Sequence, residues 1–198
     1  MLFLPGASGH GSFWDPIRAE LGDVFTESLD WPGLGDVPVA PDVSSYEDLV
    51  ELVINSLEAR DRPTTLVGQS MGGWVAARVA VTRPELVDRL VLAVTSAGVD
   101  MAALGASDWR PGARAARPDA PEWSFAVHPP MEGQLAALPH PVLLLWASDD
   151  PISPLAVGER LQSLLPTSEL VVYDSDDHWV VLQHVADVAS RIAAFVDD

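Results

Sequence analysis

Short, continuously apolar runs alternate with longer amphipathic segments, and this alternation limits what the chain can fold into more than any other feature. The runs cover residues 2–4, 64–68, 90–95, 142–147 and 170–173. Because their apolar residues are continuous rather than alternating, they are typical of strands buried on both faces of a parallel sheet. A weaker run at residues 24–29 contains polar side chains and is expected at an edge of the sheet.

The segments between these runs have the periodicity of helices. Expected helices cover residues 46–57, 71–83, 154–164 and 185–195. Ser44 and Glu47 have the spacing of a capping box at the start of the first, and Pro84 ends the second. Strands alternating with helices predict an α/β fold with a doubly wound, mostly parallel sheet of about six strands.

Composition narrows the class of protein. The 198 residues suit one domain, residues 1–198, and no apolar stretch is long enough to span a membrane. The chain has twenty-nine acidic residues and eleven basic residues, all arginine. The resulting net charge of −18 disfavours nucleic acid and membrane surfaces as partners. Cysteine is absent, which excludes disulfides and a thiol nucleophile. Without a basic segment after Met1, we expect a cytoplasmic protein.

One segment, residues 97–140, breaks the alternation. It contains several prolines and the tryptophans Trp109 and Trp123, but no clear strand. A segment of this length is either a functional lid or a disordered surface loop. Its aromatic content is unusual for a disordered linker, so we expect Trp109 and Trp123 to line a substrate pocket.

Gly68-Gln69-Ser70-Met71-Gly72 directly follows a predicted strand and opens a predicted helix. This is the G-x-S-x-G pattern in the strand–turn–helix context that exposes a nucleophilic serine. The turn is so tight that side chains at Gly68 and Gly72 would collide. We therefore predict Ser70 as a nucleophile, with the N-terminus of the following helix favouring a developing negative charge.

With this motif, the chain resembles the α/β-hydrolase superfamily, and in particular its small serine esterase-like members. In that family the order along the chain is nucleophile, acid, histidine. The resemblance places the acid on Asp150, before Pro151, with the neighbouring Asp149 as the rival. It places the histidine on His178, although Asp177 stands where the family commonly has glycine.

The resemblance also implies an oxyanion hole made of two backbone amides. One belongs to Met71, and the other to Ala7, because Pro5-Gly6 stands where the family has His-Gly. Besides the two tryptophans of the 97–140 segment, Trp179 and Phe13 are candidates for the pocket wall. The resemblance implies no metal and no cofactor.

The activity implied is hydrolysis of a small-molecule carboxylic ester, thioester or lactone through an acyl-enzyme. Lyase or C–C bond chemistry at the same three residues, and a silent relative that only binds a ligand, remain as alternatives. The family sheet has two further strands ahead of the one at residue 2, for which this chain has no residues, and the lid is short. The oligomeric state stays open.

Overall fold

A computed structural model describes residues 1–197 and contains one sheet of six parallel strands. The strands are β1 (Leu2–Leu4), β2 (Glu27–Ser28), β3 (Thr64–Gln69), β4 (Val87–Ala93), β5 (Val142–Ala147) and β6 (Ser168–Tyr173). Their order is β2-β1-β3-β4-β5-β6, and every neighbouring pair is parallel. The predicted doubly wound α/β fold is therefore confirmed.

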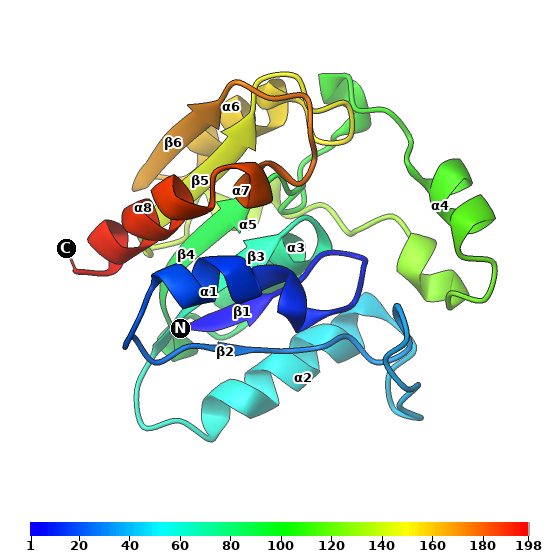
Figure 1. Cartoon of the computed structure of the whole chain (residues 1–198), viewed down its shortest axis with the longest axis horizontal. Coiled ribbons are helices and arrows are strands. Elements are labelled where there is room, and N and C mark those ends of the chain that lie inside the picture. Colours follow the sequence, from blue (N-terminus) through cyan, green and yellow to red (C-terminus); the bar gives the residue numbers. More distant parts are fainter. Residues whose placement is uncertain (198) are drawn as a thin grey trace.

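Helices cover both faces of the sheet. They are α1 (Asp15–Glu20), α2 (Tyr46–Glu58), α3 (Met71–Thr82), α6 (Leu155–Leu164), α7 (Val180–Gln183) and α8 (Val185–Asp197), with short 3-10 turns η1 (Gly11–Trp14) and η2 (Pro84–Leu86). Figure 1 shows α1 and α8 packed together in front of the sheet, with α3 and α6 on its far side. Helix α2 packs on α3.

Two buried tryptophans hold the end of β1 in place, and the loop that carries the predicted oxyanion residue Ala7 follows it. Trp14 and Trp31 are fully buried, and burying a side chain of this size contributes roughly 2–3 kcal/mol. Trp14 Nε1 donates to Leu4 O at 3.0 Å, and Trp31 Nε1 donates to Pro5 O at 2.7 Å. The hydrogen bonds satisfy both indoles and hold the chain in place just before residue 7.

Several predicted boundaries differ from the structure by a few residues, including the starts of β4 at Val87 and of β6 at Ser168. Strand β4 ends at Ala93 instead of residue 95, because Val94 adopts a positive φ of 42° that leaves the extended region. The cap of α2 is Ser45 and not Ser44: its side chain accepts from Asp48 N at 3.2 Å. The edge strand β2 keeps only Glu27–Ser28 of the predicted run at residues 24–29.

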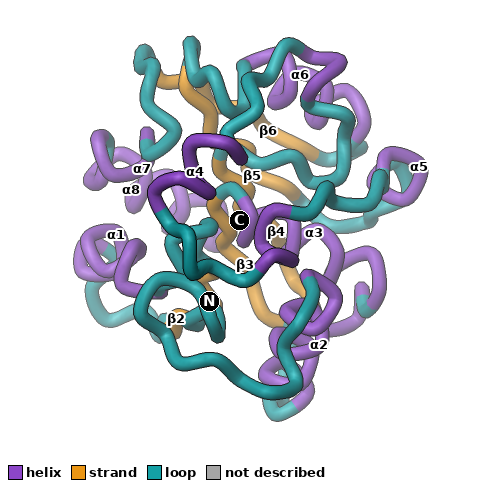
Figure 2. The backbone as a smooth tube through the Cα atoms, turned by 90° about the vertical axis from the view of Figure 1, so that its right-hand side faces the viewer, coloured by secondary structure: helices purple, strands orange, loops and turns teal. Residues whose placement is uncertain are grey.

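The 97–140 segment folds into short helical pieces beyond the carboxyl ends of the strands. These are η3 (Ala102–Leu104), α4 (Arg110–Ala116), η4 (Glu122–Phe125) and α5 (Glu132–Leu135). Figure 1 shows α4 well to the right of the sheet, and in Figure 2, which looks onto that end, α4 lies in front of the strands. Tyr46 of α2 anchors the segment, because its hydroxyl donates to the buried Ser124 O at 2.6 Å.

Candidate active site

Ser70 occupies a strained turn between β3 and α3. Its φ of 52° and ψ of −115° lie outside the regions that L-residues ordinarily adopt, at a cost of about 1–3 kcal/mol. A β-carbon on Gly68 would lie 2.5 Å from Gly72 O, and one on Gly72 would overlap Leu4 O. The two glycines therefore let strand, turn and helix approach closely enough to expose the serine at the strand end.

The structure brings Ser70, His178 and Asp150 into one hydrogen-bonded row. His178 Nε2 lies 2.9 Å from Ser70 Oγ, and His178 Nδ1 lies 2.6 Å from Asp150 Oδ2. The three residues come from the loops after β3, β6 and β5, which meet at the carboxyl edge of the parallel sheet. An imidazole held between a hydroxyl and a buried carboxylate can accept the proton of that hydroxyl.

The two adjacent aspartates have different surroundings. Asp150 is 1% exposed, and its second oxygen accepts from Ile152 N at 2.8 Å. Asp149 is exposed, and its carboxylate accepts from Ser148 Oγ at 2.7 Å. Only Asp150 pairs with the imidazole of His178 among the described residues.

Asp177, which replaces the usual glycine, directs its carboxylate into its own loop. Its two oxygens accept from Trp179 N and from Gln183 Nε2, both at 2.8 Å. It thus stabilises the turn into α7, which follows His178.

The predicted oxyanion amides, those of Ala7 and Met71, belong to two segments that meet at Ser70. A β-carbon on Gly6 would lie 3.4 Å from Ser70 Cβ, so the loop carrying Ala7 passes beside the serine. Met71 is the first residue of α3, where an amide has no acceptor within its own helix. Neither amide has a hydrogen-bond acceptor among residues 1–197. Both can donate to an oxygen that develops negative charge beside Ser70.

Matches to known proteins agree with this arrangement. The model of the "Alpha/beta hydrolase family" matches residues 1–137, more than half of the chain. This chain belongs to the alpha/beta hydrolase family. A second model, described as "TAP-like protein", matches residues 113–198.

Two curated relatives match this chain over different shares of their length. The pimeloyl-[acyl-carrier protein] methyl ester esterase of Neisseria meningitidis is 27% identical over 97% of this chain and 90% of the relative. The 2-hydroxymuconate semialdehyde hydrolase of Pseudomonas sp. (strain CF600) is 26% identical over 73% of this chain. That match covers 65% of the Pseudomonas enzyme, less than two thirds of its length.

Solved structures share the fold of this hydrolase-family chain. A hydrolase from Pseudomonas aeruginosa PA01 superposes with a TM-score of 0.81 at 23% identity, covering 100% of this chain and 89% of the other. A thermophilic esterase from Thermogutta terrifontis gives 0.80 at 24% identity, covering 99% and 88%. At such identities the likeness concerns the fold alone.

Sequence reasoning missed Gln69 as a residue of the site. Its side chain is 2% exposed, and Nε2 donates to the backbone oxygen of His178 at 3.2 Å. Thr95, two residues after the end of β4, similarly donates from Oγ1 to Ser70 O at 2.6 Å. Neither contact has a signal in the sequence, because each joins residues brought together by strand order.

Replacing Gln69 with leucine is expected to lower kcat by about three- to tenfold, the effect of one hydrogen bond. The bond positions the backbone that carries the imidazole, so KM and melting temperature are expected to change little. Steady-state kinetics with a short ester show whether the loss of activity lies in kcat or in KM. Gln162→Leu, at an exposed position of α6, is the control. An unchanged kcat in Gln69→Leu would show that the contact positions nothing.

Replacing Gly72 with alanine is expected to destabilise the fold by about 2–3 kcal/mol, because the new methyl overlaps backbone oxygens of Leu4 and Pro5. The matched control is Gly112→Ala in α4, where nothing lies within 4 Å of the added carbon. That change is expected to be neutral or to stabilise by up to about 1 kcal/mol, since alanine is the better helix former. Urea unfolding of both variants tests the difference; equal stability would contradict the tight turn.

The four predicted pocket-wall residues pack against aromatic neighbours or lie at the surface, and their role as pocket walls stays a prediction. Trp123 packs edge-on against Tyr46 with ring centroids 5.5 Å apart, and Trp109 packs against Phe125 at 6.2 Å. Trp179 follows His178 but is 58% exposed, and Phe13 packs edge-on against Trp14.

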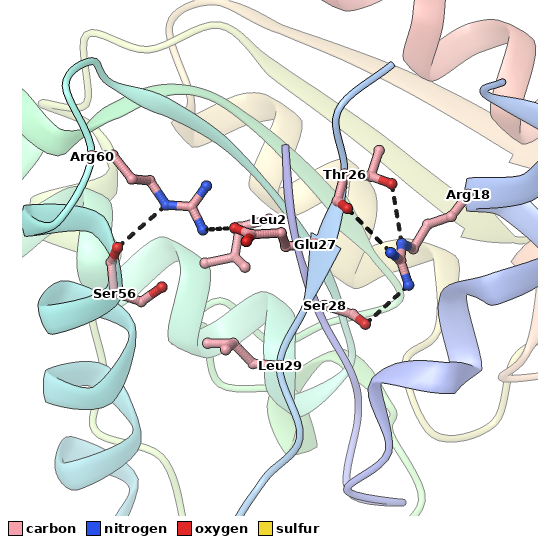
Figure 3. Close-up of a pocket in the computed structure, with 8 residues that line it drawn as sticks. All are labelled: Leu2, Arg18, Thr26, Glu27, Ser28, Leu29, Ser56 and Arg60. Carbon is pink, nitrogen blue, oxygen red and sulfur yellow. Dashed lines mark hydrogen bonds and ion pairs between the residues drawn. The ribbon is translucent and has the colours of Figure 1, made fainter. Parts of the chain in front are cut away.

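A hollow of about 340 Å³ lies at the opposite, amino end of the sheet beside β2. Figure 3 shows Arg18 and Arg60 reaching this edge strand from opposite sides. Arg18 donates to Thr26 O at 3.1 Å, and Arg60 pairs with Glu27. The hollow is remote from the serine, and the two arginines cover polar groups of a sheet edge that is otherwise open to pairing.

Within residues 1–197, no helix combines the length and the apolar character needed to cross a bilayer. The same part of the chain contains no group of three or more histidine and acidic side chains arranged to hold a metal ion.

Proposed function

We propose that this chain is a serine hydrolase that cleaves a carboxylic ester of a small molecule. The observation that carries the proposal is the continuous row from Asp150 through His178 to Ser70, with distances of 2.6 and 2.9 Å. The family already makes a hydrolase the expected class, and the row supplies a nucleophile, a base and a buried acid. The relative from Neisseria meningitidis, named a methyl ester esterase, supports an ester as the substrate.

In the first step, Ser70 Oγ attacks the ester carbonyl while His178 Nε2 takes the hydroxyl proton. The carbonyl oxygen becomes an oxyanion that accepts from the amides of Ala7 and Met71. The protonated imidazole then gives its proton to the leaving alcohol as the ester bond breaks, which leaves an acyl group on Ser70. Asp150 keeps the Nδ1 proton in place and stabilises the charged ring.

In the second step, a water molecule gives a proton to His178 and attacks the acyl carbonyl. The bond to Ser70 Oγ breaks, the serine regains the proton, and the carboxylic acid leaves. Because the cycle needs only a carbonyl and a leaving group, thioesters and lactones fall within the same proposal.

Short p-nitrophenyl esters together with a fluorophosphonate probe test this function. We expect steady ester turnover that the probe stops by reacting with one site per chain. Labelling without turnover of any ester, thioester or lactone would point to lyase or C–C bond chemistry at the same residues. Neither labelling nor turnover in the folded protein would mean a silent relative, and the proposal would fail.

A further inference from the structure

His128 is a buried histidine of the 97–140 segment that the hydrolytic steps do not use. Its ring stacks on Trp74 of α3, with centroids 4.8 Å apart and an interplanar angle of 19°. Tyr46 of α2 lies edge-on against the same ring at 4.4 Å. Burial, assisted by the positive charge of Arg110, lowers the pKa of His128 to about 3, so the ring is neutral in ordinary buffers.

The hydrogen bonds around His128 indicate which nitrogen carries the ring proton. His128 Nδ1 lies 3.3 Å from Ser96 Oγ, and this oxygen already accepts from Gly98 N at 3.4 Å. Since Ser96 Oγ already accepts this bond, we assign its hydroxyl hydrogen to Nδ1, with Nδ1 as the acceptor. The neutral ring then carries its proton on Nε2.

Two N–H donors on stacked rings are consequently buried without an acceptor. His128 Nε2 and Trp74 Nε1 are both inaccessible to solvent, and neither has a hydrogen-bond partner among residues 1–197. Leaving such a donor unpaired costs about 1–3 kcal/mol, so buried polar groups are nearly always satisfied. A pair of them on α3, the helix that begins after Ser70, and on the segment stacked against it calls for a ligand that supplies the missing acceptor.

Trp74 belongs to α3, which begins at the Ser70 turn, and His128 is bonded to Ser96 in the loop after β4. Trp74 lies one helical turn after the serine, its amide donates to Ser70 O at 3.2 Å, and its side chain leans toward the helix N-terminus. Ser96 follows Thr95, which is bonded to Ser70 O, in a loop where Val94 and Ala97 both have positive φ. This strained loop holds the partner of His128 close to the nucleophile.

His128 and Trp74 lie with α2 and α3, whereas His178 enters from the loop after β6. The leaving oxygen must approach Nε2 of His178, which enters from the loop after β6. Trp74 and Tyr46 belong to α3 and α2, which pack on each other, so His128 lies on the α2–α3 side of the serine. The part of the substrate that points away from the leaving group is the acyl part.

We propose that His128 Nε2–H and Trp74 Nε1–H form a subsite for a second oxygen in the acyl chain of the substrate. The preferred esters thus carry a keto or carboxylate oxygen a few carbons from the scissile carbonyl and are not plain alkanoates. This inference rests on the proposed ester hydrolysis and adds the class of acyl group to it.

Three methyl esters of matched length test the subsite: methyl pentanoate, methyl 4-oxopentanoate and monomethyl succinate. We expect the wild-type protein to hydrolyse at least one oxygen-bearing ester about tenfold or more better than methyl pentanoate in kcat/KM, since each hydrogen bond contributes about three- to tenfold. Comparing methyl 4-oxopentanoate with monomethyl succinate shows whether the subsite prefers a ketone oxygen or a carboxylate oxygen. In His128→Phe, which keeps the stacking surface, this preference over methyl pentanoate, the ratio of the two kcat/KM values, is expected to fall to about one.

His128→Gln is the second variant, because its amide nitrogen takes a position near that of Nε2; it is expected to restore part of the preference. His184→Phe is the matched control, since His184 also stacks on an aromatic ring, Tyr173, at 4.5 Å but belongs to the segment before α8. Fluorophosphonate labelling reports on Ser70 in every variant, so loss of the subsite is distinguishable from loss of the hydrolase. Equal rates for all three esters in the wild type, or an unchanged preference in His128→Phe, would overturn the inference.

Discussion

Ser70→Ala is expected to abolish ester turnover and fluorophosphonate labelling, with a fall in kcat on the order of 10⁶-fold, as for removal of a nucleophilic serine elsewhere. Only the hydroxyl is lost, and the backbone of the turn is held by Gly68 and Gly72. The melting temperature is therefore expected to stay within a few degrees. Circular dichroism and an ester assay on the same preparation measure both effects.

The control for this change is Ser163→Ala, on the exposed surface of α6, which is expected to retain full activity. If Ser70→Ala kept a tenth of the wild-type rate, another group would have to perform the attack. The assignment of the nucleophile would then be wrong even though the family remains.

Asp150→Asn is expected to lower kcat by about 10⁴-fold, the effect of replacing the acid in other serine triads. An amide at this position can donate to Nδ1, which turns the imidazole to the wrong tautomer for accepting the proton of Ser70. The variant keeps a group that can accept from Ile152 N, so the loop is expected to stay folded.

Asp149→Asn provides the adjacent comparison and is expected to remain within about tenfold of wild type, because an outer contact is worth on the order of 1 kcal/mol. Its carboxylate is exposed and bonded to Ser148, with no contact to the imidazole among the described residues. Kinetics of both variants at one pH decide the assignment. The reverse ranking would transfer the role of the acid to Asp149.

Much of the sheet could be predicted because its strands are buried on both faces. The apolar run at residues 142–147 became β5 with the same bounds, and a parallel strand in this position has no reason to include polar residues. The run at residues 90–95 is equally apolar, yet its last two residues leave the strand because Val94 turns into the left-handed region. Hydrophobicity reports burial, and both parts of that run are buried, so the pattern alone could not place the end of β4.

The candidate triad could be predicted because each member follows a strand with a local motif. The surroundings of the site could not be predicted in the same way. His128, Trp74 and Tyr46 come from three separate segments, and their stacking depends on how the 97–140 segment returns over α3. Trp109 and Trp123 were favoured as pocket walls because they are large and apolar. In the structure Trp109 contacts Phe125 within the segment and Trp123 contacts Tyr46 of α2, and their place in the pocket wall stays a prediction.

Trapping the acyl-enzyme tests the central claim most directly. Wild-type protein mixed with p-nitrophenyl acetate and quenched in acid within the first turnovers is expected to carry one acetyl group, located by peptide mass spectrometry on the peptide that contains Ser70. The same experiment on His178→Ala is expected to show no adduct on this time scale, because the hydroxyl has lost its base. An acetyl group on another residue, or steady turnover with no covalent adduct at any quench time and no burst of p-nitrophenol, would contradict the account.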